Sequence, residues 1–386
     1  MARFLRDPLR DLASPPRGQV PALDFLRAIA VLLVIVVHTR GLYVERFGED
    51  TALTGSMLVR YGWSGVDLFF VLSGFLIGKQ LWREVAASKT VDVKRFILRR
   101  GFRIWPLYFG FCIFTLVVLG RGEFPFGKWW QDITFTSNYF HHELVRGSWS
   151  LSTEEQFYIL TPLLLLFGSK RLGSLRAYRP YLWSLLVLFP LLRAITWWRL
   201  TGSFSHHDSA LWVLRIYLPF HLHADPLVMG LILSNLTASG DEAGGHRTLW
   251  TLLLGAVVCL PLVLVQREVF SFTEVALLFG ACVRFAISPM ARRVPLLGAR
   301  VFYVLSRLSF GMYLNHRYFE SFVFDLFTRP GTAPGHGPPF LVLYGALALV
   351  SALASVVTFC LVEHPFLELR SRLLERPAPA PAAQAA

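Results

Sequence analysis

Residues 23–40 read LDFLRAIAVLLVIVVHTR, and this stretch decides the class of fold. Ten apolar residues stand without interruption between Arg27 and His38. A helix of about 20 mainly apolar residues spans the hydrocarbon core of a bilayer. The same bias continues through all 386 residues, which are 54% hydrophobic and 16% charged. Because soluble domains carry about 25% charged residues, we predict an integral membrane protein.

Further apolar stretches follow the first one along the chain. Hydropathy predicts an all-α fold, a polytopic helical bundle with about ten transmembrane helices. The predicted spans are residues 22–41, 61–80, 103–120, 152–168, 181–198, 211–235, 248–266, 270–288, 302–326 and 339–362. They form one membrane domain, residues 22–366, between a basic N-terminal tail (1–21) and a disordered Pro/Ala-rich tail (367–386).

The basic residues are divided unevenly between the two sets of loops. About 24 of the 38 Lys and Arg residues fall on the side that carries both termini, and about 11 on the other side. Cytoplasmic loops of membrane proteins are enriched in Lys and Arg. We therefore predict cytoplasmic termini and a bacterial-type cytoplasmic (inner) membrane. The same bias explains the net charge of +13, so membrane lipid is an expected partner and nucleic acid is not.

The four cysteines lie singly in apolar stretches, and no two of them form a Cys-x-x-Cys pair. This distribution predicts neither a disulfide framework nor a zinc site. We expect no metal cofactor.

Arg27 and His38 are the first polar groups that stand out, because a charge inside a span costs about 2.5–3.5 kcal/mol on insertion scales. At about 100° per residue, their eleven-residue separation places both on one helix face, about 16 Å apart along the axis. Two polar groups on one apolar stripe indicate a polar path. A histidine near a helix end can also be a simple interfacial residue.

Two acidic residues lie near the predicted outer ends of their spans. Asp67 and Glu154 can each orient the His38 imidazole or accept a proton. Asp67 is equally explained as an interfacial acid. Ser152 and Glu155 fit an S-x-x-E capping box, which leaves Glu154 without a structural task.

Residues 94–108 read KRFILRRGFRIWPLY and place Arg100 and Arg103 three residues apart on a helix. Paired guanidinium groups can hold a phosphate through bidentate hydrogen bonds. The alternative is that both are positive-inside residues without a ligand. Elsewhere, His221 and Asp225 spell an H-x-x-x-D pattern of soluble CoA-dependent acyltransferases, but Pro226 and the membrane context favour coincidence. His223 and His316 receive no role.

Six motifs occur in order along the chain, and together they resemble the acyltransferase-3 family of integral-membrane O-acyltransferases over about residues 22–366. The motifs are Arg-x10-His (Arg27 and His38), GVDLFFVLSGFLIG (65–78), Arg-x-x-Arg followed by I-x-P-x-Y (100–108), SWSLSTEEQFY (148–158), YLNH (313–316) and VEHPF (362–366). The sixth span departs from the family pattern, since it carries His221 and His223.

The resemblance implies transfer of an acyl group, commonly acetyl from acetyl-CoA, to a hydroxyl of an extracytoplasmic or membrane-linked glycan or small molecule. It implies that Arg27 and His38 are essential and that Arg100, Arg103 and Glu154 are functional. We assign His38, Glu154 and Arg27 as catalytic and, as substrate-binding, Arg100, Arg103, Asp67, Trp149 and Ser150.

The hypothesis that follows is that acyl-CoA enters from the cytoplasm with its phosphates on Arg100 and Arg103. Its thioester then reaches His38, which acts as general base or transient acyl carrier. The alternatives are a transporter of an anionic or glycan substrate, because intramembrane Arg, His and Glu also mark ion paths, and a non-catalytic scaffold. Formation of a CoA-dependent product distinguishes the first from the others.

Overall fold

The computed structural model describes residues 2–16, 18–48, 53–119, 129–140, 143–204, 208–240, 245–328 and 337–374. Within these ranges the chain is helical and contains no strand, which confirms the predicted all-α bundle. The long helices are α2 (Pro21–Phe47), α4 (Gly65–Ser88), α5 (Val93–Phe114), α8 (Ser148–Ser169), α9 (Arg179–Thr201), α12 (Gly245–Val265), α13 (Arg267–Ala286), α14 (Arg300–Phe327) and α15 (Phe340–Thr358).

Shorter helices and turns connect them. The short α-helices are α1 (Ala2–Ala13), α3 (Met57–Arg60), α6 (Trp130–Ile133), α7 (Ser137–Phe140), α10 (Ser209–Trp212), α11 (Asp225–Ala238) and α16 (His364–Leu374). The 3-10 and π segments that matter below are η1 (Tyr61–Ser64), η2 (Thr115–Leu119), η5 (Val213–Tyr217), η6 (Phe220–Leu222) and η10 (Phe359–Glu363).

Seven helical segments of the described chain are long and apolar enough to cross a membrane, so the predicted count of about ten is not confirmed. They are 21–47, 61–88, 93–118, 175–201, 246–265, 267–286 and 340–374. Helices α8 and α14 coincide with the fourth and ninth predicted spans but are not among these seven.

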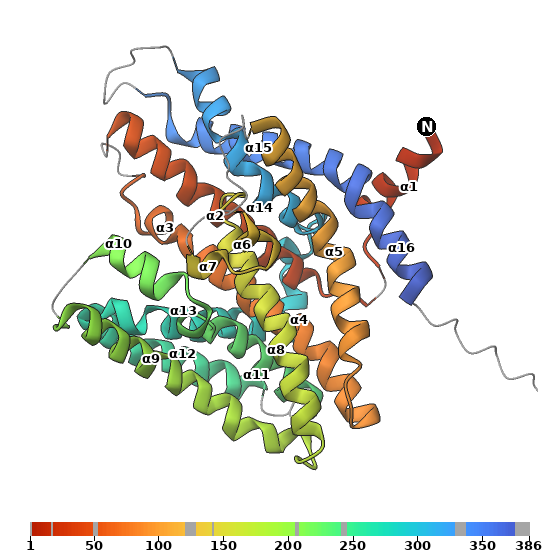
Figure 1. Ribbon diagram of the computed structural model, residues 1–386, viewed down its shortest axis with the longest axis vertical. Helices are drawn as coiled ribbons and strands as arrows, with labels where there is room; N and C mark the ends of the chain where they lie inside the picture. The colour runs from red at the N-terminus through yellow and green to blue at the C-terminus, as the bar shows by residue number, and fades with distance from the viewer. Residues whose placement is uncertain are drawn as a thin grey trace, which may run out of the picture.

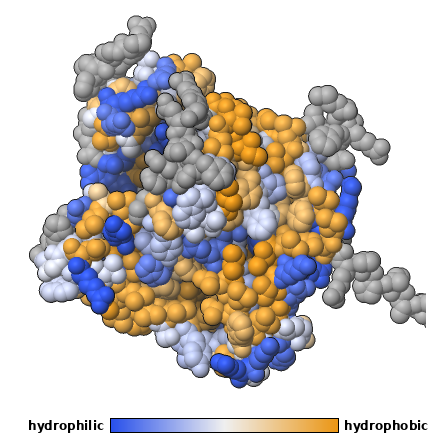
Figure 2. All heavy atoms as spheres, viewed as in Figure 1, coloured by the Kyte–Doolittle hydropathy of each residue, from blue (hydrophilic) through white to orange (hydrophobic). Residues whose placement is uncertain are grey.

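The outer surface of the bundle is apolar, as expected for contact with lipid. On α12, Leu254, Val257 and Leu264 are 64%, 65% and 79% exposed. Figure 2 shows large hydrophobic areas on the visible face, with hydrophilic side chains gathered mainly toward its edges. In water, so much exposed apolar area would drive association, whereas lipid solvates it.

The sixth predicted span, 211–235, is not one continuous helix. The chain runs through α10 and η5, leaves helical geometry near Pro219, and resumes as α11 at Asp225. A break at membrane depth requires partners for the freed backbone groups. His223 Nδ1 donates to the Tyr217 carbonyl at 2.6 Å, and Arg193 Nη1 donates to the Leu222 carbonyl at 2.7 Å. His223 and Arg193 thus support the break, although a hydropathy average over the span does not reveal it.

Arg193 is the main support of this break. Its guanidinium group is fully buried and forms a bidentate pair with Asp225, with distances of 2.7 and 2.8 Å. It also donates to the Val269 carbonyl at 2.5 Å and to the Thr273 hydroxyl at 2.7 Å. This network ties α9, α11 and α13 together. Because Asp225 is committed to Arg193 while His221 lies exposed beside Tyr139, the H-x-x-x-D pattern is a coincidence, as expected.

Glycines allow α4 to pack closely against α2 and α11. A Cβ atom added to Gly74 would lie 2.0 Å from the Leu227 carbonyl oxygen of α11. One added to Gly65 would lie 2.6 Å from the Ala30 carbonyl oxygen of α2. Figure 1 shows α4 near the centre of the bundle. These approaches place the inner face of α4 against the stripe of α2 that carries Arg27 and His38.

The two ends of the described chain meet at one end of the bundle. In Figure 1, α1 and α16 lie on the same side of the molecule, and His364 Nε2 lies 3.2 Å from Asp11 Oδ2. Helix α16 continues to Leu374, so the predicted disordered tail is wrong for residues 367–374. Residues 375–386 lie outside the described ranges.

Candidate active site

Two neighbouring cavities lie along the inner face of α2. An outer cavity of about 820 Å³ is lined by His38, and an inner cavity of about 100 Å³ is lined by Arg27. The two cavities share two lining residues, Val66 and Tyr313. The predicted polar stripe of α2 therefore faces an interrupted path, with its two polar residues in successive chambers.

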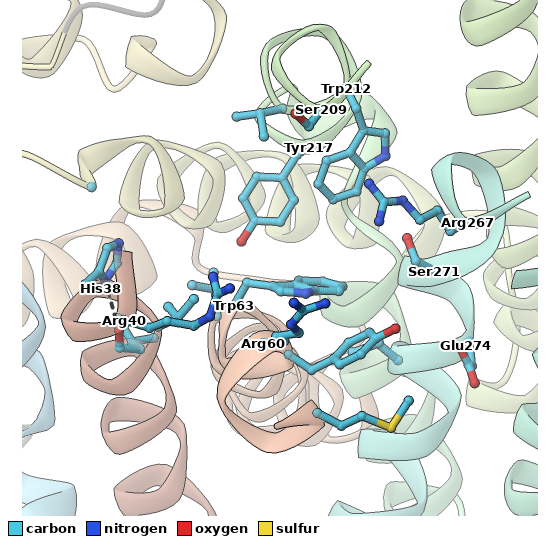
Figure 3. A pocket seen from close by; sticks show the side chains of 18 of the residues that line it. His38, Arg40, Arg60, Trp63, Ser209, Trp212, Tyr217, Arg267, Ser271 and Glu274 are labelled. Carbon is cyan, nitrogen blue, oxygen red and sulfur yellow. Dashed lines mark hydrogen bonds between the residues drawn. The ribbon is translucent and has the colours of Figure 1, made fainter. Parts of the chain in front are cut away.

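The outer cavity combines aromatic and charged side chains (Figure 3). Trp63 and Tyr217 contact each other edge to face in its wall, with ring centroids 6.0 Å apart. The other aromatic side chains of the lining are Tyr61, Trp149, Trp212 and Tyr313, and its charged ones are Arg40, Arg60, Arg267 and Glu274. Flat apolar surfaces surrounded by hydrogen-bonding groups suit an amphipathic ligand such as a sugar.

The hydrogen bonds of His38 determine which ring nitrogen is available. Its Nδ1 lies 2.9 Å from the Val34 carbonyl oxygen and 3.1 Å from Nε2 of His316. Nδ1 of His316 lies 3.1 Å from the Met312 carbonyl oxygen. A carbonyl only accepts, so in the neutral rings both Nδ1 atoms carry the proton. The Nδ1 proton of His38 is therefore shared between the Val34 carbonyl oxygen and Nε2 of His316, which leaves the lone pair of His38 Nε2 for a substrate proton.

Neither acidic residue that was predicted to orient His38 contacts it. Asp67 is fully buried and bonds to Nε2 of His223 at 2.7 Å, away from both cavity linings. Glu154 faces the inner cavity, and His316 takes the predicted place beside His38. The expected Asp67–His38 and Glu154–His38 contacts are wrong, because each acid lies next to a nearer hydrogen-bond donor.

Glu154 is held by two hydroxyl groups in the inner cavity. Ser73 donates to one carboxylate oxygen at 2.6 Å, and Tyr158 donates to the other at 2.9 Å. Two neutral donors fix the position of the carboxylate without neutralising its charge. Glu154 is thus aimed at the arginines of the same cavity.

Three arginines meet Glu154 in this small space. Arg27, Arg100 and Arg103 all line the inner cavity, which brings together residues from α2 and α5 as the motifs suggested. Within the described residues, none of the three forms an ion pair, although Arg27 and Arg100 are attracted by Glu154 at longer range. The cavity therefore has an excess of positive charge and suits an anionic ligand.

Tyr313 separates the two cavities. Its hydroxyl donates to the Gly147 carbonyl oxygen at 3.0 Å and lies 2.5 Å from the Ser150 hydroxyl. Ser150 lines the inner cavity and Trp149 the outer one. These two predicted substrate-binding residues thus lie on either side of the division between the chambers.

A loop acid holds the start of α8 in place. Glu143 accepts from the backbone N–H groups of Gly147 and Trp149, at 2.8 and 3.0 Å. Burial raises the pKa of Glu143, and the two backbone hydrogen bonds oppose that shift. Helix α8 begins at Ser148, so the predicted capping box formed by Ser152 and Glu155 is wrong. Both residues lie inside the helix, and Glu155 accepts from Trp105 Nε1 at 3.2 Å.

Sequence reasoning missed four side chains that complete the site. These residues are Ser73, Tyr158, Tyr313 and His316. A usable signal was present for the last two, since residues three apart on a helix share a face. Tyr313 and His316 therefore form one polar patch on α14.

His316 is expected to position His38 through the Nδ1 hydrogen bond. Replacing His316 by alanine removes the side-chain acceptor and leaves only the Val34 carbonyl, and we expect kcat for group transfer to fall about tenfold, with KM changed less than twofold. His316→Gln offers an amide oxygen to the same proton and should recover part of the loss. Steady-state kinetics of both variants test this. A general packing role would instead leave both variants equally impaired, with lower thermal stability.

Fold and cavities together define a polytopic helical membrane protein with a charged path through its core. A family described as "Acyltransferase domain", the acyltransferase-3 family, matches residues 20–360. The chain belongs to this family, as the motifs indicated. Among the described residues, no group of three or more His, Cys, Asp or Glu side chains could hold a metal ion. No solved structure matches the chain.

Several curated proteins are similar to part of the chain. The O-acetyltransferase OatA of Staphylococcus aureus is 32% identical over 166 residues, which cover 38% of this chain and 25% of that protein. The peptidoglycan O-acetyltransferase OatA of Listeria monocytogenes is 29% identical over 168 residues, which cover 39% of this chain and 25% of that protein. The chain thus matches about a quarter of the length of these relatives.

Proposed function

We propose that this protein is a membrane O-acetyltransferase that moves an acetyl group from acetyl-CoA to a hydroxyl of a glycan. The observation that carries the proposal is the pair of adjoining cavities, one with an excess of arginines and one with a histidine whose Nε2 is available. Family membership supports acyl transfer. The relatives' names support a glycan acceptor, such as peptidoglycan.

The donor approaches from the side of the inner cavity, which we assign to the cytoplasm from the Lys and Arg distribution. Arg100 and Arg103 bind the donor's diphosphate, and Arg27 guides the arm that carries the thioester. Along α2, Arg27 and His38 are about 16 Å apart, a separation that suits a long thin arm. Tyr313 moves aside to let the thioester meet His38.

Transfer then proceeds at His38. Nε2 takes the proton of the acceptor hydroxyl while the oxygen attacks the thioester carbonyl carbon. The tetrahedral intermediate collapses, the carbon–sulfur bond breaks, and the thiolate takes the proton from the imidazolium. In the second version of this step, Nε2 itself attacks the thioester and holds the acetyl group until the acceptor arrives. Both versions end with an ester and a free thiol.

The experiment feeds acetyl-CoA with a labelled acetyl group to inside-out vesicles that contain the wild-type chain. We expect label in an ester of the lipid-linked or glycan fraction and an equal amount of free CoA. Vesicles without the protein give the background. A transporter would move label or glycan without forming CoA, and that result would overturn the proposal. Acceptors added from peptidoglycan and other glycans then identify the acceptor class.

A further inference from the structure

A second basic site lies outside the catalytic path, between α4 and α5. A groove of about 770 Å³ follows the end of α4 and the start of α5, on the side predicted to be cytoplasmic. Four cationic side chains line it: Lys79, Arg83, Arg95 and Arg99. It is several times larger than the inner cavity of about 100 Å³, which is too small for a nucleotide.

The two acids of the groove are already engaged by the backbone. Glu84 accepts from the backbone N–H of Asp92 at 2.6 Å, and Asp92 accepts from the backbone N–H of Arg95 at 3.0 Å. They close the turn between the helices and cap α5. In the described chain, none of the four cations forms an ion pair with them or with any other acid.

The cations are placed where they repel one another unless an anion joins them. Lys79 and Arg83 lie four residues apart on α4, and like charges at this spacing destabilise a helix. Arg83 is close enough to act on Lys79 electrostatically. The groove also contains the start of α5, where the helix dipole favours negative charge. This combination indicates a site for phosphate groups.

The groove and the inner cavity are lined by the same two helices, α4 and α5. On α4, Ser73 lines the inner cavity while Leu76 and Arg83 line the groove. The ten residues from Ser73 to Arg83 correspond to about 15 Å. On α5, Phe96 lines the groove, and its ring centroid lies 5.9 Å from the Arg100 guanidinium of the inner cavity. The groove therefore lies close enough to the inner arginines for one extended ligand to contact both.

We propose that this groove binds the 3′-phosphorylated adenosine end of the acyl-CoA donor, an assignment that rests on the proposed acetyl-CoA-dependent function. Coenzyme A carries its diphosphate between a long arm and a 3′-phosphorylated adenosine. The diphosphate lies at Arg100 and Arg103, and the 3′-phosphate lies at Arg83 and Arg99. The headgroup of an anionic lipid has the same phosphate chemistry, so the experiment separates the two sources.

The test measures binding of CoA and of dephospho-CoA, which lacks the 3′-phosphate, to the full chain in phosphatidylcholine nanodiscs. The wild type is expected to prefer CoA about tenfold. The double variant Arg83→Gln/Arg99→Gln should bind CoA about tenfold more weakly and lose the preference. The matched control, Lys170→Gln/Arg171→Gln, removes two exposed charges on the same predicted side and should bind like the wild type.

Each other result has a definite meaning. If the wild type binds CoA and the double variant keeps both affinity and preference, the groove assignment is overturned and the proposed function stands. If the wild type binds no CoA, the donor assignment fails and this inference fails with it. Nanodiscs that also contain phosphatidylglycerol test whether the groove binds an anionic lipid instead. Retention of that lipid by the wild type but not the variant, with CoA affinity unchanged, would assign the groove to lipid.

Discussion

His38→Ala is expected to lower acetyl transfer about 10³-fold while leaving a folded protein. The variant loses Nε2, the ring nitrogen of His38 that has no hydrogen-bond partner in the described chain, and His38 lines the outer cavity. General acid–base catalysis by a positioned side chain contributes about 10²–10⁴-fold, so the loss falls within that range. The measurement is the initial rate of label transfer from acetyl-CoA in vesicles with matched protein levels.

The control for this variant is His221→Ala. His221 is an exposed histidine that contacts Tyr139, and it lines neither cavity. Its loss should leave the rate within twofold of the wild type. Full activity of a folded His38→Ala protein would rule out both roles proposed for the imidazole.

A trapping experiment separates the two roles of His38. Without an acceptor, the acyl-carrier version leaves the acetyl group on Nε2, where mass spectrometry of a rapidly quenched sample detects it on the peptide that contains residue 38. The general-base version leaves no such adduct, because the hydroxyl must be present before the thioester is attacked. An adduct in the wild type and none in His38→Ala would establish the carrier.

Much of the fold follows from features that sequence carries locally. Apolar runs of sufficient length predicted the helices, and the eleven-residue separation placed Arg27 and His38 on one side of α2 before any contact was known. Gly65 and Gly74 lie where α4 meets its neighbours, and a glycine permits such close helix packing. Each of these inferences needs only one helix and its own periodicity.

Contacts between helices were the part that sequence could not supply. Asp67 and Glu154 were placed beside His38 because all three were predicted near the outer side of the membrane. A similar height in the membrane does not show which neighbouring helix each side chain faces. The structure pairs Asp67 with His223 of the broken sixth segment, and His38 with His316 of α14. The break was hidden as well, because Arg193, which supports it, lies in a different span.

Arg103→Gln is expected to raise KM for acetyl-CoA about 100-fold with a much smaller change in kcat. A charge-assisted hydrogen bond contributes about 1.5–3 kcal/mol, and each 1.4 kcal/mol is tenfold in affinity. Arg103 lines the inner cavity but lies away from His38, so it acts on the donor's charge rather than on the reacting carbonyl. Arg103→Lys keeps the positive charge but loses the planar guanidinium group that can form two parallel hydrogen bonds. Its KM for acetyl-CoA should lie between those of the wild type and Arg103→Gln.

The same substitution should stabilise the protein when no donor is bound. Arg103 shares the small inner cavity with two further cations, Arg27 and Arg100, and like charges at short range repel one another. Removing one cation relieves that repulsion, so we expect the thermal midpoint of unliganded Arg103→Gln to rise by about 2 °C. CoA should then stabilise the variant less than the wild type, because the stabilisation by a ligand, RT ln(1 + [L]/Kd), falls as Kd rises. A lower midpoint with an unchanged KM would instead make Arg103 a structural residue, and the inner cavity would lose its assignment to the donor.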